Sequence, residues 1–224
     1  MSEEAVVNVW RQHQNCTLCP LSQTRRNIVF GTGNPDAKIL IVTDPPSTAQ
    51  DREGTHATRD IRWLSSMYKS VTGGRAKLET SAAQMLKRVF IVSATMCCPT
   101  HQTGEYQGQQ RAPSYKEIKS CAPRLAETIY AVDPIVILCF GSHARSALFA
   151  KQTGLDTYAN RLEFVDLPGK FGIDVRYSVL LAPALSVAEE SGDYNYANGK
   201  IQAVQKALTK AFSLVDAITT EDQP

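Results

Sequence analysis

Residues 38–47 read KILIVTDPPS, a run of mostly β-branched apolar residues that ends at an acidic residue and two prolines. Such a run predicts a short buried strand of a parallel sheet. The prolines end the strand because they cannot donate ladder hydrogen bonds. Similar runs follow at 89–94 (VFIVSA), 135–140 (IVILCF) and 178–182 (SVLLA). We expect these four runs to belong to one sheet.

Helical patterns separate the strands. Residues 59–71 carry apolar side chains at helical spacing, and Ser114 with Glu117 forms a capping-box signal for a helix to about residue 130. Further helices are expected after Gly141 and over about 200–212. Strands that alternate with helices predict an α/β fold, a single α/β/α sandwich with a central, mostly parallel sheet. We expect one domain over residues 1–215 and a disordered tail over 216–224.

Ligands of such folds bind at the carboxyl ends of the parallel strands. This rule directs attention to the residues that end or follow the predicted strands, which are Asp44, Ser93, Gly141 and Ala182.

Composition narrows the class of protein. The chain has 224 residues, a net charge of +2 and 43% hydrophobic residues, which excludes a disordered or supercharged protein. The sequence contains no apolar run of about 18 residues and no apolar leader segment, so we expect a soluble, cytoplasmic protein without a membrane partner. Residues 52–88 carry 8 basic and 3 acidic side chains. This excess suits a polyanion such as nucleic acid, or is simply a solvated face.

Six cysteines are the strongest chemical signal. Cys16 and Cys19 form a C-x-x-C pair, Cys97 and Cys98 are adjacent after the second strand, and Cys121 lies on a predicted helix. One pair plus two later cysteines supplies four thiolates, which suits a 4Fe–4S cluster or a zinc ion. Reduced, unliganded thiols are the third possibility. Cys139 lies inside a predicted strand and is expected to be a small buried apolar residue.

These motifs resemble those of one family. The segment from Cys16 to Ala37 (CTLCPL, then VFGTGNPDA) is similar to the opening of the iron–sulfur (family four) uracil-DNA glycosylases, and so are residues 91–100 (IVSATMCCPT), 111–121 and 133–144. The resemblance covers most of residues 10–190. It implies a uracil-DNA glycosylase-like fold and a structural 4Fe–4S cluster held by Cys16, Cys19, Cys97 and Cys121. Cys98 could replace Cys97, since neighbours in an extended segment point opposite ways.

The catalytic motifs depart from the family. Where the resemblance implies a G-E-A-P-G segment whose carboxylate orients water, this chain has TDPPS with Asp44. Ala57 stands where the family stacks a Phe on the flipped uracil, and Ser93 where an Asn reads the uracil edge. Ala182 replaces the His that stabilises the departing base. Each missing donor costs on the order of 10²–10³ in rate, so we expect a degenerate pocket that does not excise uracil.

Two functional hypotheses follow. The first is a DNA-binding accessory subunit for replication or repair, for example bound to a polymerase in a bacterial or phage-infected cell. Basic side chains would then contact phosphates, Leu185 would be a wedge in the duplex, and the long loop at 99–114 would contact the partner. The basic residues are Arg59, Arg62, Lys69, Arg75 and Lys77.

The second hypothesis is an active DNA glycosylase that hydrolyses the N-glycosidic bond of a modified or damaged base. Asp44 would then orient the water, and His56 or His101 would replace the missing His. A metal protein unrelated to DNA is a third reading, which predicts no salt-sensitive binding to a duplex.

Overall fold

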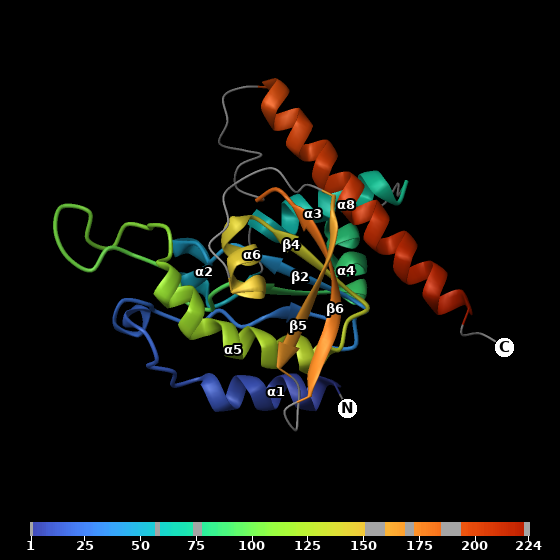
Figure 1. Cartoon of the computed structure of the whole chain (residues 1–224). Helices are drawn as coiled ribbons and strands as arrows, with labels where there is room; N and C mark the ends of the chain where they lie inside the picture. Colours follow the sequence, from blue (N-terminus) through green and yellow to red (C-terminus); the bar gives the residue numbers. More distant parts are fainter. Residues whose placement is uncertain are drawn as a thin grey trace.

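A computed structural model of the chain describes residues 2–56, 59–73, 78–150, 160–168, 173–184 and 194–221. Its core is a six-stranded sheet in the order β1-β3-β2-β4-β6-β5 (Figure 1). The strands are β1 (Thr32–Gly33), β2 (Ile39–Thr43), β3 (Val89–Ser93), β4 (Val136–Phe140), β5 (Leu162–Pro168) and β6 (Asp174–Ala182). The four apolar runs of the sequence are therefore neighbours in one sheet.

The direction of the strands determines where a site can form. The four central strands β3, β2, β4 and β6 are parallel, whereas the edge strands β1 and β5 are antiparallel to their neighbours. This confirms the predicted α/β fold with a mostly parallel sheet. The carboxyl ends of β2, β3, β4 and β6 consequently meet at one edge, which we call the carboxyl edge.

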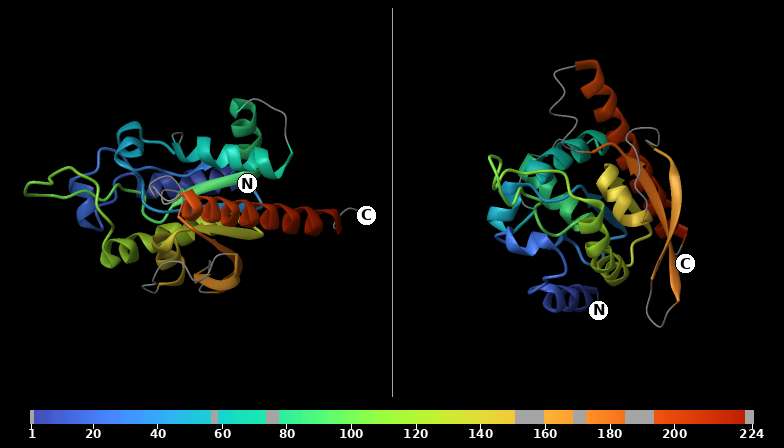
Figure 2. Two further views of the ribbon diagram at one scale, coloured as in Figure 1. Left: turned by 90° about the horizontal axis from the view of Figure 1, so that it is seen from above. Right: turned by 60° about the vertical axis from the view of Figure 1, so that its left-hand side comes forward.

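Helices cover both faces of the sheet (Figures 1 and 2). One face packs with α1 (Ser2–His13), α5 (Tyr115–Val132) and α6 (Ser142–Phe149), and the other with α3 (Arg59–Val71), α4 (Leu78–Arg88) and α8 (Tyr194–Glu221). Alternate residues of each strand face opposite sides: Leu40 and Val42 lie in the first core, Ile39 and Ile41 in the second. Burial on both sides explains why the strands are continuously apolar.

Capping motifs determine where two helices, α5 and α2, begin. The side chain of Ser114 accepts from Glu117 N, and Glu117 in turn accepts from Ser114 N, so α5 begins where the sequence predicts. Ser47 and Gln50 cap α2 (Thr48–Glu53) in the same way, and Gly54 ends it with a left-handed φ of 70°.

The sequence pattern did not predict several of the helices and strands. Neither α1, α2, α4 nor the two-residue β1 was predicted, because short or terminal elements give weak periodic signals. Helix α8 continues through residues 216–221, which were assigned to the tail, and an ion pair between Arg88 and Asp216 ties this extension to α4. The predicted loop at 99–114 projects from the body (Figure 1). Of the helices in the described ranges, none has both the length and the apolar character needed to cross a membrane.

Candidate functional site

Strand register brings the predicted strand-end residues together at the carboxyl edge. Thr43 is paired with Ser93 across β2 and β3, and Phe140 with Ala182 across β4 and β6. Asp44 and Gly141 directly follow β2 and β4, which are neighbours in the sheet. Four separate sequence motifs therefore converge on this edge.

Asp44 is paired with a residue that the sequence reading did not single out. Nδ1 of His143, in the first turn of α6, lies 3.2 Å from Asp44 Oδ1. This hydrogen bond raises the pKa of His143 above its ordinary value, while partial burial acts in the opposite direction. A histidine held this way retains its proton to higher pH. Among the described residues, nothing donates a hydrogen bond to Asp44 Oδ2.

Gly141 allows the close approach of this pair. Its φ is 94°, and a Cβ built on it would lie 2.5 Å from Asp44 Oδ2. Any side chain at this position would displace the carboxylate, besides forcing a left-handed conformation that L residues rarely adopt. His143 follows only two residues after this glycine at a strand end, and that position was the signal that could have identified it.

His56, one of the two histidines proposed from sequence, lies beside the same edge but is fully buried. Its Nε2 shares a hydrogen bond of 3.5 Å with Ser93 Oγ, which in turn lies 3.1 Å from Thr43 Oγ1. Its Nδ1 has no hydrogen-bond partner among the described residues. Burial lowers the pKa of His56 to about 4, so the ring is neutral at physiological pH. A neutral ring in this position cannot act as the cation that an anionic leaving group needs.

The second proposed histidine, His101, lies in the projecting loop, with its ring centroid 5.9 Å from that of Tyr106. It lines a polar cavity of about 440 Å³ with Arg26 and Arg52, away from the Asp44–His143 pair.

The proposed DNA contacts are only partly described. Arg62 is exposed on α3 and Lys69 is partly exposed two turns further along. Arg59 begins α3, and its side chain lies outside what the structure describes. Ala57, Arg75, Lys77 and Leu185 also lie outside the described residues.

A second constellation forms beside the start of α5. Cys16, Cys19, Cys97 and Cys121 line one small cavity, together with Arg25 and Arg124. Cys98 is not among the residues that line it, and the Cys98 Sγ instead contacts the carbonyl of Pro99 at 3.9 Å. The adjacent cysteines therefore point different ways, and Cys97 is the one at the cavity.

Both arginines donate hydrogen bonds to cysteines that line this cavity. Arg25 donates to Cys16 O (2.7 Å) and to Cys97 Sγ (3.6 Å), and Arg124 Nη2 donates to Cys16 Sγ at 2.6 Å. Arg124 Nε and Nη1 are buried and have no partner among the described residues. Buried donors without acceptors are costly, so the cavity fits an anionic group that accepts hydrogen bonds.

Burial raises the pKa values of the buried thiols and so favours their neutral, protonated form. It raises the pKa of Cys97 to about 11 and that of Cys98 to about 12, and it also raises the pKa of Cys121, although the nearby arginines oppose the rise at Cys97 and Cys121. These thiols are neutral without a metal, and metal binding must release their protons.

A zinc ion and a 4Fe–4S cluster require different distances between their sulfur ligands. A tetrahedral zinc site needs sulfur atoms only about 3.8 Å apart, given Zn–S bonds of about 2.3 Å. Within the described ranges, no three His, Cys, Asp or Glu side chains form a group that could hold a single ion. A 4Fe–4S cluster binds each thiolate through a different iron and accepts a wider spacing. The four cysteines that line the cavity are the described residues that could hold a metal group.

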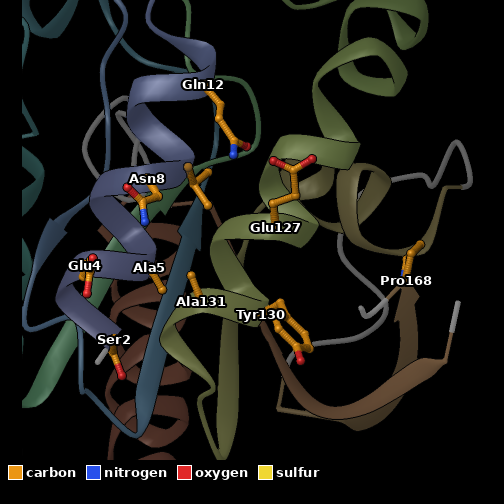
Figure 3. A pocket seen from close by; sticks show the side chains of 10 residues that line it. Ser2, Glu4, Ala5, Asn8, Gln12, Glu127, Tyr130, Ala131 and Pro168 are labelled. Atoms are coloured by element: carbon orange, nitrogen blue, oxygen red, sulfur yellow. The ribbon is translucent and has the colours of Figure 1, made fainter. Parts of the chain in front are cut away.

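A groove of about 680 Å³ lies between α1 and α5 (Figure 3). Glu127, Tyr130 and Ala131 of α5 line it, opposite Asn8 and other residues of α1. Because α5 ends just before β4 begins, this groove lies toward the amino ends of the strands. None of the candidate site residues lines it.

The sequence of the chain is similar to those of known proteins. A family model described as the uracil DNA glycosylase superfamily matches residues 30–199, more than half of the chain. Curated relatives are named type-4 uracil-DNA glycosylases. The protein of Sulfurisphaera tokodaii is 30% identical over 61% of this chain and 54% of its own length. Those of Archaeoglobus fulgidus and Thermotoga maritima are each 27% identical, over 65% and 64% of this chain and 64% and 66% of their own lengths. The chain thus spans between about half and two thirds of these relatives.

Proposed function

Because the chain belongs to the uracil-DNA glycosylase superfamily, we propose that it is a DNA glycosylase that hydrolyses the N-glycosidic bond of a base other than uracil. The observation that carries this proposal is the hydrogen bond between Asp44 and His143 at the carboxyl edge. This hydrogen bond raises the pKa of His143, which favours a proton-donating ring at the edge where Ala182 stands in place of the histidine that the family resemblance implies.

The reaction breaks the bond between the sugar C1′ and a base nitrogen and joins C1′ to a water oxygen. The electron pair of the broken bond leaves with the base, so negative charge develops on the base and positive charge on the sugar. The imidazolium of His143 donates its Nε2 proton to the departing base, and the water that attacks C1′ gives one proton to the Asp44 carboxylate, so the two proton transfers balance. Asp44 Oδ2 orients that water, and the carboxylate stabilises the sugar cation. Donors arranged in advance where charge develops are the largest contribution to many enzymatic rates.

The residues around the Asp44–His143 pair determine which base we expect the protein to excise. Ser93 is engaged with Thr43 and His56, and a hydroxyl offers fewer contacts to a base edge than the Asn of the family. Without edge reading, flipping is repaid best for a base that is already weakly paired, because less energy is needed to extrude it. We therefore expect a modified or damaged base rather than uracil in a normal pair.

The cysteine cavity supports a structural role for a 4Fe–4S cluster held by Cys16, Cys19, Cys97 and Cys121. When bound, the cluster would cross-link the segment before the 3-10 turn Pro20–Gln23, the segment after β3 and the second turn of α5. We further propose that residues 1–215 act as one DNA-binding unit, with Arg59, Arg62, Lys69, Arg75 and Lys77 contacting phosphates and Leu185 entering the duplex.

A second candidate is an accessory DNA-binding protein without catalysis. It is favoured by the replacement of the family's donors with Ser93 and Ala182 and by the projecting loop at 99–114, which could contact a polymerase or another replication protein.

Excision assays distinguish the two candidates. The iron-loaded protein, purified without oxygen, is incubated with single- and double-stranded oligonucleotides that carry uracil or one of a panel of modified bases. We expect cleavage of at least one modified base, loss of cleavage in Asp44→Asn, and retained DNA binding in that variant. Salt-dependent binding without cleavage of any base would contradict the glycosylase and favour the accessory protein.

A further inference from the structure

Arg124, which lies outside the carboxyl edge, is a buried arginine with guanidinium nitrogens that are unpaired within the part of the chain that the structure describes. It lies on α5 and its exposed fraction is 4%. Of its three guanidinium nitrogens, Nη2 alone has a partner among the described residues, the Sγ of Cys16 at 2.6 Å. Nε and Nη1 make no hydrogen bond with the described residues. A buried cation in this state is costly unless an anion compensates it.

Among the residues that the structure describes, no carboxylate at the cavity is free to compensate this charge. Among the described residues that line it, the acidic one is Glu117. Both oxygens of Glu117 are taken by Arg111, at 2.9 and 2.6 Å, and one also accepts from Ser114 N at 2.7 Å. Glu117 is thus neutralised by a different arginine and serves to cap α5.

Arg25 does not have the same need. Its guanidinium is divided between the carbonyl of Cys16 and the Sγ of Cys97, so it already has an uncharged oxygen acceptor. Arg124 has only a thiol sulfur, which is a weak acceptor while it is protonated. The described part of the chain offers no further acceptor to Arg124, so a group bound in the cavity would supply it.

The spacing of Cys121 and Arg124 on α5 places both residues at the cysteine cavity. Cys121 and Arg124 are three positions apart on α5, so both side chains lie on one face of the helix. The cavity that Cys121 enters is also lined by Arg124 and, from other segments, by Cys16, Cys19 and Cys97. A 4Fe–4S cluster with four thiolate ligands is anionic, and its sulfur atoms accept hydrogen bonds.

We propose that Arg124 is a positioning residue for the cluster: an internal counter-charge that donates hydrogen bonds to cluster and thiolate sulfur and holds the Cys16 segment against it. This inference rests on the cluster of the proposed function. Its consequence is electrostatic, because a buried positive charge stabilises the more negative, reduced cluster. Arg124 therefore raises the reduction potential of the cluster.

The test compares Arg124→Leu, Arg124→Gln and Arg124→Lys with Lys119→Leu, which removes a positive charge from an exposed position of the same helix. Each protein is purified without oxygen. Iron and sulfide are measured per chain, and the reduction potential of the cluster is measured at an electrode.

We expect lower potentials in Arg124→Leu and Arg124→Gln, a potential near that of the wild type in Arg124→Lys, and no change in Lys119→Leu. Where the leucine variant does not fold, the glutamine and lysine variants alone carry the comparison, and rescue by lysine identifies the charge. Full iron content with an unchanged reduction potential in Arg124→Gln would overturn the proposed role of Arg124. The proposal that the protein binds a cluster would then be retained. Wild-type protein that carries zinc and no iron would overturn the cluster itself, and with it this inference.

Discussion

Acid should destabilise this protein through His56, because the ring is buried in its neutral form. The ordinary pKa of a histidine in an unfolded chain is about 6.5, and burial lowers the pKa of His56 in the folded state to about 4. The unfolded chain binds a proton first as the pH falls, so the stability contributed by the neutral ring is complete above the unfolded pKa. It is lost as the pH falls toward 4. Lowering the pH from about 7 to about 5 removes about 2 kcal/mol of the free energy of unfolding by this linkage.

The comparison with His56→Gln isolates this effect. Glutamine cannot titrate, yet its amide can still reach Ser93, and all other acid-sensitive groups are shared by the two proteins. Urea unfolding of both, followed by the fluorescence of the two tryptophans, gives the free energy at each pH. We expect the wild type to lose about 2 kcal/mol more than the variant between the two pH values. An equal loss in both proteins would refute the reasoning and mean that His56 is protonated or solvated in the folded state.

Three further predictions concern the two candidate sites. Gly141→Ala should displace the Asp44 carboxylate, since the new Cβ would lie 2.5 Å from its Oδ2; we expect about 10²-fold slower excision with little change in DNA binding, and excision at the wild-type rate would contradict this. Cys97→Ser should lose the iron while Cys98→Ser keeps it, because only Cys97 lines the cavity; iron analysis of both decides, and the reverse pattern would identify Cys98 as the ligand. Asp44→Asn should lower the pKa of His143, because the hydrogen bond to the carboxylate is what raises it; an NMR titration of the ring measures the shift, and an unchanged pKa would mean that the pair does not form in solution.

The fold could be predicted largely from the sequence. The β-branched runs at 38–43, 89–94, 135–140 and 178–182 became β2, β3, β4 and β6, because strands buried on both faces leave a continuous apolar signal. The start of α5 was also predictable, because Ser114 and Glu117 form a local motif. The carboxyl edge then followed from strand direction alone.

Residues whose role depends on tertiary contacts were not predictable. His143 is a single histidine after a glycine, and only the adjacency of β2 and β4 brings it to Asp44. Arg124 reads as an ordinary basic residue of an amphipathic helix until its burial and unpaired nitrogens are known. His56 was a loop histidine by sequence, and it is the core beside Ser93 that keeps it neutral.

The most direct test of the central claim is the single-turnover rate of base excision by His143→Gln, on the modified base that the wild type removes fastest. The matched control is His101→Gln, the same substitution in the projecting loop. We predict a fall of about 10²–10³ for His143→Gln, no change for His101→Gln, and equal DNA affinity for both. Equal rates in the two variants would contradict the proposed role of the Asp44–His143 pair.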